Sequence, residues 1–186
     1  LFMGIPKQAK KVFQGEIFSI YQWPQKMFDG SYKIFERAKR QDTVIIIATV
    51  KNKIVLLKQR QPGTSWFYCT PSGRMDIKGE KPLVAAKREL LEETGMVAQK
   101  VFLWKKREKK GKVISTIYYY IAQNCKKITE QSLDNGEQIK VKLISFTEFT
   151  NLVNSTNANI GELFIDLFKA STDKIYKQYL TKLIFG

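Results

Sequence analysis

The sequence contains no histidine among its 186 residues. Histidine is the base in hydrolases that work through a Ser-His-Asp triad or a Cys-His pair, so both mechanisms are excluded. Any proton acceptor in this protein has to be a carboxylate, a lysine or a tyrosine. Because the chain has only two cysteines, we do not expect a structural zinc site either.

Long apolar runs are also missing, and cysteine is scarce. Cys69 and Cys125 are too few for a disulfide framework, and we expect both to be buried thiols. No apolar run reaches the length needed to cross a bilayer, and there is no signal-peptide pattern. The sequence therefore predicts no membrane association and a cytoplasmic location. Its apolar content of 44% suits a globular domain.

Acidic residues are outnumbered by basic ones, 17 against 32, which gives a net charge of +15. A field of this sign attracts polyphosphates and nucleic acid. The excess is mostly lysine spread along the chain, which a general bias in composition also explains. Nucleic acid is therefore an open partner, but the charge alone does not favour it.

The most informative segment combines a loop, a helix and a set of carboxylates. Pro82 suits the first turn of a helix, and Gly95 suits the position just past its end. Glu89, Glu92 and Glu93 are spaced by three and four residues, so they share one face of this helix. Like charges on one face favour a neutralising cation. Oxygen ligands of this kind suit Mg²⁺, with Mn²⁺ as the alternative.

Taken alone, the three glutamates would also be typical of a solvated helix end. Here Glu80 in the loop, Arg88 in the helix and the terminal Gly95 all occur in register with them. This combination favours a metal site over a solvated face. Arg88 adjoins the acidic face, so it supplies part of the neutralising charge.

The segment reads as a glutamate, seven residues and then Arg-Glu-Leu-Leu-Glu-Glu-Thr-Gly, which resembles the box of the Nudix hydrolases. Members of this family act on nucleoside diphosphates linked to another group. The resemblance implies that Glu89, Glu92 and Glu93 bind the metal and that Glu80 completes the acidic cluster. It also implies catalytic roles for Glu92, Glu93 and Arg88, with Arg88 orienting the glutamates.

The loop before the helix departs from the Nudix pattern by one residue. Six residues separate Gly73 from Glu80 where the family has five, and Arg74 stands at the expected glycine position. We interpret this as a one-residue insertion, with Gly73 still making the turn. The resemblance implies a metal ligand from the backbone carbonyl of Ser72 and substrate contacts from Gly73 and Arg74.

Two further segments are similar to those of ADP-ribose pyrophosphatases within this family. Glu137 stands in an acidic loop whose glutamate acts on the catalytic water or the metals, although the preceding Asp-Asn-Gly is also an ordinary turn. Lys58 and Arg60 stand where that subfamily binds substrate, while Gln61 replaces one of its arginines. Adjacent strand residues face opposite sides, so substrate contact through Arg60 requires a register shift.

The pattern of strands and helices predicts an α+β fold with a mixed sheet between helices, and the resemblance implies the Nudix αβα sandwich. The expected strands are residues 12–23, 32–40, 43–50, 54–59, 66–70, 99–107, 113–122 and 139–145. The expected helices after the box are residues 147–153, 160–170 and 173–183.

We divide the chain into an N-terminal β-hairpin arm at residues 1–40 and a Nudix hydrolase domain at residues 41–186. Asp29-Gly30 is the expected turn of the arm. Because isolated hairpins are marginal in water, the arm needs a packing partner. The resemblance implies a homodimer that exchanges this arm.

The resemblance implies Mg²⁺-dependent hydrolysis of a nucleoside diphosphate linked to another moiety, as in ADP-ribose or a nucleotide sugar. The products are a nucleoside monophosphate and the phosphorylated moiety. One alternative is a pyrophosphohydrolase of RNA 5′ ends or nucleoside triphosphates. The other is a nucleotide-sensing Nudix module without turnover.

Overall fold

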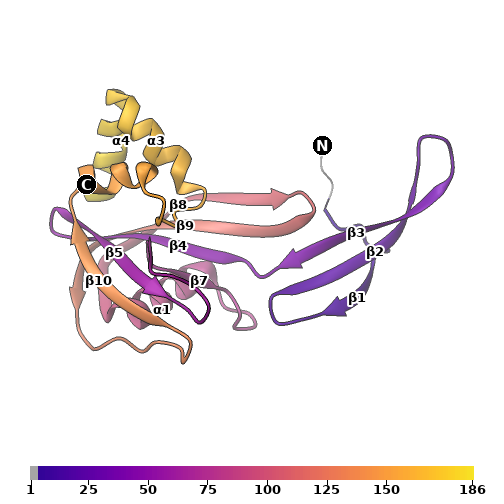
Figure 1. The fold of residues 1–186 in the computed structure, drawn as a ribbon, viewed down its shortest axis with the longest axis horizontal. Helices are drawn as coiled ribbons and strands as arrows, with labels where there is room; N and C mark the ends of the chain where they lie inside the picture. Colours follow the sequence, from indigo (N-terminus) through magenta and orange to yellow (C-terminus); the bar gives the residue numbers. More distant parts are fainter. Residues whose placement is uncertain (1–3) are drawn as a thin grey trace.

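The computed structural model describes residues 4–186 and has a mixed β-sheet as its central feature (Figure 1). The strands follow the order β1-β2-β3-β9-β4-β5-β10, and β6, β7 and β8 pair with β5, β4 and β9 beside this path. The strands are β1 Lys10–Gln14, β2 Phe18–Lys26, β3 Tyr32–Arg40, β4 Thr43–Val50, β5 Lys53–Arg60, β6 Phe67–Cys69, β7 Ser72–Arg74, β8 Met96–Lys110, β9 Val113–Lys127 and β10 Gln138–Ile144. The helices are α1 Pro82–Thr94, α2 Phe146–Thr150, the 3₁₀ helix η1 Asn151–Asn154, α3 Leu163–Thr172 and α4 Lys174–Phe185.

The N-terminal arm is a three-stranded antiparallel sheet that projects from one end of the molecule (Figure 1). The turn at Asp29-Gly30 is confirmed, with Gly30 at a φ of 85°. The single strand predicted over residues 12–23 is wrong, because the chain reverses where the amide of Gly15 donates to the carbonyl of Phe18. The arm joins the body through β3, which pairs in parallel with β9.

Strand β4 lies at the centre because its β-branched side chains are buried on both faces, as the sequence predicted. It runs parallel to β9 and antiparallel to β5 and β7. Strand β5 pairs in turn with β10 and β6. The sequence did not predict the short strand β7, which joins the loop to β4 and brings it against α1.

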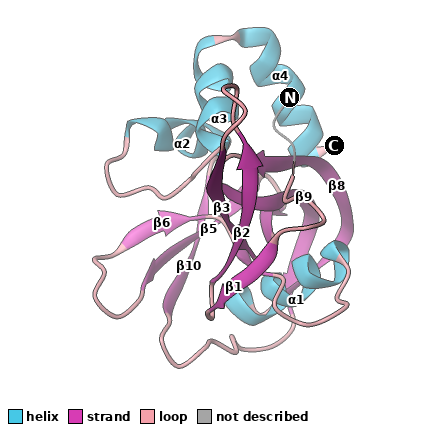
Figure 2. Ribbon diagram, turned by 90° about the vertical axis from the view of Figure 1, so that its right-hand side faces the viewer, coloured by secondary structure: helices cyan, strands magenta, loops and turns pink. Residues whose placement is uncertain are grey.

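Helices cover both faces of the sheet, which confirms the αβα sandwich (Figure 2). Ala85, Ala86 and Leu90 of α1 pack in one hydrophobic core with the sheet. On the other face, Leu167 of α3 and Leu180 of α4 belong to a second core. The box helix therefore lies apart from the three C-terminal helical segments.

Several predicted boundaries shift. The hairpin of β8 and β9 is longer than expected at both ends. Helix α3 begins at Leu163 and not at residue 160, because Gly161 has a φ of 49° that an α-helix cannot contain. The helix expected at residues 147–153 divides into α2 and η1. Among the described residues, no helix is both long and apolar enough to span a membrane.

Candidate active site

Well-defined ends position helix α1. Pro82 is its first residue, and Gly95 ends it at a φ of 68° in the left-handed region. The amide of Gly95 donates to the carbonyl of Leu91 at 2.7 Å. A Cβ at Gly95 would lie 2.1 Å from the carbonyl oxygen of Thr129, so this position accepts no side chain. Both predicted ends of the helix are confirmed.

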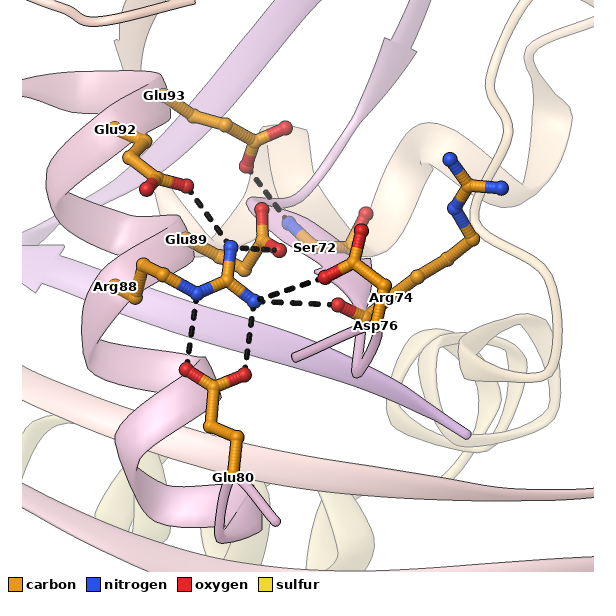
Figure 3. A network of polar contacts seen from close by, with 8 residues as sticks. All are labelled: Ser72, Arg74, Asp76, Glu80, Arg88, Glu89, Glu92 and Glu93. Atoms are coloured by element: carbon orange, nitrogen blue, oxygen red, sulfur yellow. Dashed lines mark hydrogen bonds and ion pairs between the residues drawn. The ribbon is translucent and has the colours of Figure 1, made fainter. Parts of the chain in front are cut away.

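Glu93 is the most buried of the three helix glutamates, with 5% of its surface exposed. Its Oε2 accepts a hydrogen bond of 2.8 Å from the amide of Ser72 on β7 (Figure 3). Burial raises the pKa of Glu93 well above its ordinary value, although the bond from Ser72 opposes the shift. The charges of Glu89 and Glu137 raise this pKa further. Glu93 is thus fixed by a hydrogen bond to one of its oxygens, and burial disfavours its charged form. A bound cation would stabilise that charged form.

Glu89 lies against the backbone of the loop. A Cβ at Gly73 would lie 1.9 Å from Cδ of Glu89, so only glycine leaves room for this carboxylate. Burial raises the pKa of Glu89 to about 7, while the neighbouring Arg88 opposes the shift. Despite the inserted residue in the loop, the backbone at Gly73 thus lies close to the carboxylate of Glu89.

Arg88 is the centre of the acidic network (Figure 3). Its Nε and one terminal nitrogen bind both carboxylate oxygens of Glu80, each at 3.0 Å. Its other terminal nitrogen donates to Glu89 at 2.8 Å and to Glu92 at 3.0 Å. The backbone carbonyl of Arg74 accepts a further bond at 3.3 Å. These contacts raise the pKa of Arg88 above its ordinary value, with the bond to Glu80 as the largest cause.

We expect Arg88→Lys to reduce turnover by roughly 10- to 100-fold, because a lysine cannot reproduce the fork that orients the carboxylates. It should also lower the free energy of unfolding by about 1–3 kcal/mol, since Glu80 is left with unpaired oxygens. Steady-state kinetics and thermal unfolding measure the two effects. Arg107→Lys, at the ion pair with Glu162, is the matched control and should change neither quantity appreciably. Unchanged turnover in Arg88→Lys would remove the orienting role.

The acidic face opens into a cavity of about 500 Å³. Most of the site residues that the sequence predicted line this cavity, together with residues from other parts of the chain. The predicted ones are Ser72, Gly73, Arg74, Arg88, Glu89, Glu92, Glu93 and Glu137. Glu80 stands behind them, with its carboxylate bound by Arg88 and 5% of its side chain exposed.

Lys58 and Arg60 do not line this cavity. Strand β5 pairs with β10 in continuous register, so no shift alters the alternation of its side chains. Gln59 and Gln61 line the cavity, whereas Lys58 and Arg60 lie near the ring of Trp66. Lys58 therefore lies away from the cavity in which its predicted substrate contact would be made. Arg60 lines a second cavity of about 360 Å³, which also contains Gln61 and Glu137.

Glu137 approaches the site from the loop before β10, and Gln61 Nε2 donates to its Oε1 at 3.5 Å. Burial raises the pKa of Glu137, and the charge of Asp134 adds to the shift. Sequence reasoning missed Asp76, which lies 3.8 Å from Arg88. It also missed Arg40 of the arm, which lines the cavity. Asp76 lies between Arg74 and Glu80 in the loop before the helix, whereas Arg40 carries no local signal because only the tertiary fold brings it here.

The residues present fit a divalent cation, although within residues 4–186 no three acidic side chains converge into a ready-made metal site. Arg88 bonds to both Glu89 and Glu92, but its single positive charge offsets only part of their negative charge. The donors are carboxylate oxygens, which suit Mg²⁺ or Mn²⁺. Burial is the first cause of the raised pKa values of Glu89 and Glu93, and neighbouring carboxylates add to it, so both groups would gain from further positive charge. A cation in the cavity would supply it.

Comparison with known proteins gives the family. The NUDIX domain family matches residues 39–166. ADP-ribose pyrophosphatase of Bacillus subtilis (strain 168) is 27% identical over 150 residues, covering 78% of this chain and 80% of that protein. Methanol dehydrogenase activator of Bacillus methanolicus is 28% identical over 145 residues, covering 76% of this chain and 78% of that protein.

A solved structure described as an ADP compounds hydrolase matches the fold with a TM-score of 0.74 at 19% identity, covering 95% of this chain and 94% of that one. The fold and the site together define an enzyme with an αβα sandwich. The acidic face of its helix α1 lines a polar cavity, and Arg88 bonds to the glutamates of that face. With the family match over most of its length, the chain belongs to the NUDIX domain family.

Proposed function

We propose that the protein is a divalent-cation-dependent pyrophosphohydrolase of nucleoside diphosphates linked to another moiety, with ADP-ribose as the first candidate. The observation that carries the proposal is the face of α1, where Glu89, Glu92 and Glu93 line one cavity around Arg88. The similarity to a bacterial ADP-ribose pyrophosphatase supports the substrate class.

In this proposal Glu89, Glu92 and Glu93 hold Mg²⁺, with Mn²⁺ as the alternative, and the Ser72 carbonyl is a further candidate ligand. Ions held there would neutralise charge on the diphosphate and lower the pKa of water. Glu80 fixes Arg88 through both of its oxygens. Arg88 then fixes the ends of Glu89 and Glu92, which are otherwise flexible.

Glu137 is our candidate for the proton acceptor, with a box glutamate as the alternative. Its raised pKa brings it closer to neutral pH, where a base is most effective. Water forms a new bond to one phosphorus, the bridging P–O bond breaks, and the water proton passes to Glu137. The products are a nucleoside monophosphate and the phosphate of the other moiety.

Besides Arg88, which orients the glutamates, two more arginines line the cavity. Arg40 comes from the arm and Arg74 from β7. Guanidinium groups bind phosphate oxygens in a fork geometry, so we assign both to the substrate phosphates. Gln59 has a buried side-chain oxygen without a partner among the described residues, which suits a donor on the substrate.

We also propose that residues 1–40 form a separate arm that packs on a second copy of the chain, and that residues 41–186 form the hydrolase domain. The arm exposes apolar side chains that a homodimer would bury: Val12, Phe13, Phe28, Ile34 and Phe35. Light scattering after gel filtration measures the mass. Two free, buried cysteines support a reducing, cytoplasmic location.

A phosphate-release screen with a coupled phosphatase tests the function. The panel contains ADP-ribose, nucleotide sugars, NADH, dinucleoside polyphosphates, nucleoside triphosphates and 5′-triphosphate RNA, with and without Mg²⁺. We expect Mg²⁺-dependent turnover of a nucleoside diphosphate derivative. Activity confined to RNA or triphosphates would contradict the substrate assignment. No turnover with any metal, together with thermal stabilisation by a nucleotide, would favour a sensing module.

A further inference from the structure

A basic and aromatic surface lies on the side of the sheet that faces away from the catalytic cavity. Strands β6, β5 and β10 are neighbours there (Figure 2). Tyr68 is paired with Lys58, which is paired with Lys140, so these side chains project from the same face. We call this the basic–aromatic face, and its residues are Trp66, Tyr68, Lys58, Arg60, Lys140 and Lys142.

The aromatic rings on this face are surrounded by cations. Lys58, Arg60 and Lys140 lie 5.5, 4.9 and 5.4 Å from the centre of the Trp66 ring. Lys142 lies 5.2 Å from the centre of the Tyr68 ring, and its Nζ is 3.3 Å from the tyrosine hydroxyl. The two rings are half-buried and therefore held in place, while Arg60, Lys140 and Lys142 are exposed.

The positive charge of this face is not neutralised. Across residues 4–186, the ion pairs of the protein involve none of these four cations. The nearest polar partner of Arg60 is the uncharged Gln138, at 2.7 Å. Because basic residues outnumber acidic ones by 32 to 17, unpaired cations are common in this chain, and what points to an anionic ligand here is the clustering of four of them around two aromatic rings.

We propose that the basic–aromatic face binds single-stranded nucleic acid. Cations that track the phosphates and flat side chains that stack on the bases are the two requirements for such binding. Both occur here within three adjacent strands. The long lysine and arginine side chains can leave the rings for phosphates and so free the ring faces for bases. An acidic protein would use the cations but would gain nothing from the rings.

None of the residues of this surface lines the catalytic cavity, although Arg60 at its edge lines the neighbouring cavity that also contains Gln61 and Glu137. On β5, Lys58 and Arg60 face the basic–aromatic side, whereas Gln59 faces the cavity. The proposal therefore does not depend on hydrolysis. It also gives a location to part of the net charge of +15.

Fluorescence anisotropy tests the binding of a labelled oligouridylate of about 12 nucleotides with a 5′-hydroxyl end. EDTA removes divalent cations and the oligonucleotide has no 5′ phosphate, so metal-dependent binding of its 5′ end in the catalytic cavity does not contribute to the signal. We expect the affinity to fall steeply with salt between roughly 50 and 200 mM, with a log–log slope of about −2 to −3 for four phosphate contacts. No detectable binding at the lowest salt would overturn the proposal.

Two variants separate the charged and aromatic contributions. Lys140→Gln with Lys142→Gln should make the slope shallower by about 1.4. Trp66→Leu should weaken binding roughly 5- to 100-fold with the slope unchanged, and Trp66→Phe should restore most of the affinity. Thermal unfolding verifies that each variant is folded. The matched control Lys177→Gln with Lys182→Gln removes the same charge from exposed positions on α4 and should leave the slope unchanged.

The same assay distinguishes nucleic acid from other anionic ligands. Polyglutamate or anionic phospholipid vesicles that displace the oligonucleotide at equal charge concentration would show a general anion surface and would overturn the proposal. Wild-type affinity in Trp66→Leu would do the same, because stacking would then play no part. Hydrolytic activity has no bearing on either result.

Discussion

Glu93→Gln is expected to lower turnover by about 10²- to 10⁴-fold while the protein stays folded. Glutamine keeps the size of the side chain and an oxygen that accepts the bond from the Ser72 amide. It removes the negative charge that the proposed cation requires. Because burial raises the pKa of Glu93, its ionised form lowers the stability of the metal-free protein as pH rises above the ordinary glutamate range. Glutamine avoids this loss, so the metal-free variant should melt at an equal or higher temperature.

Steady-state kinetics with the substrate found in the screen, and thermal unfolding with and without Mg²⁺, measure these effects. The variant should also lose most of the stabilisation that Mg²⁺ gives to the wild type. Glu130→Gln is the control, since that carboxylate is exposed and, within residues 4–186, its ion pair is with Lys127. Full turnover in Glu93→Gln would end the assignment of this helix face as the catalytic centre.

Gly73→Ala is expected to reduce turnover by roughly 10²-fold with a stability loss of about 1 kcal/mol. The new Cβ would occupy the place of the Glu89 carboxylate, at 1.9 Å from its Cδ. Gly73 does not have a positive φ, so alanine strains the backbone little. The atom that has to move is the end of a flexible side chain, which explains why catalysis should suffer more than folding.

The matched control is Gly111→Ala at the turn between β8 and β9, where a Cβ meets nothing within 4 Å. It should keep full turnover. A double-mutant cycle with Glu89→Ala isolates the cause, because alanine at position 73 should cost little once the carboxylate is gone. If the two losses multiply instead, the effect of Gly73→Ala does not act through Glu89.

The box helix was predictable from sequence because its determinants are local. Pro82, Gly95 and the spacing of the glutamates specify the helix, its ends and its acidic face without help from the rest of the chain. The break between β1 and β2 was missed because residues 12–23 are rich in apolar and aromatic side chains, which masked the turn at Gly15.

The position of Lys58 and Arg60 shows what a single sequence cannot supply. Their side of the sheet depends on the register of β5 with β10, which lies some eighty residues further on. Arg40 reaches the cavity through the path of the arm, another long-range property. The chemical character of the site was therefore predictable, but the residues around the substrate were not.

Arg88 acts as a counter-ion that the protein carries itself. Because its guanidinium bonds to Glu80, Glu89 and Glu92 and offsets part of their charge, we expect the acidic helix to fold without a metal ion. In the proposed mechanism, metal ions would compete with this tethered cation for the same oxygens, so their occupancy would follow the free ion concentration of the surroundings. A chelator should thus abolish hydrolysis without unfolding the protein. Domains whose folding depends on a structural metal, in contrast, unfold when the metal is removed.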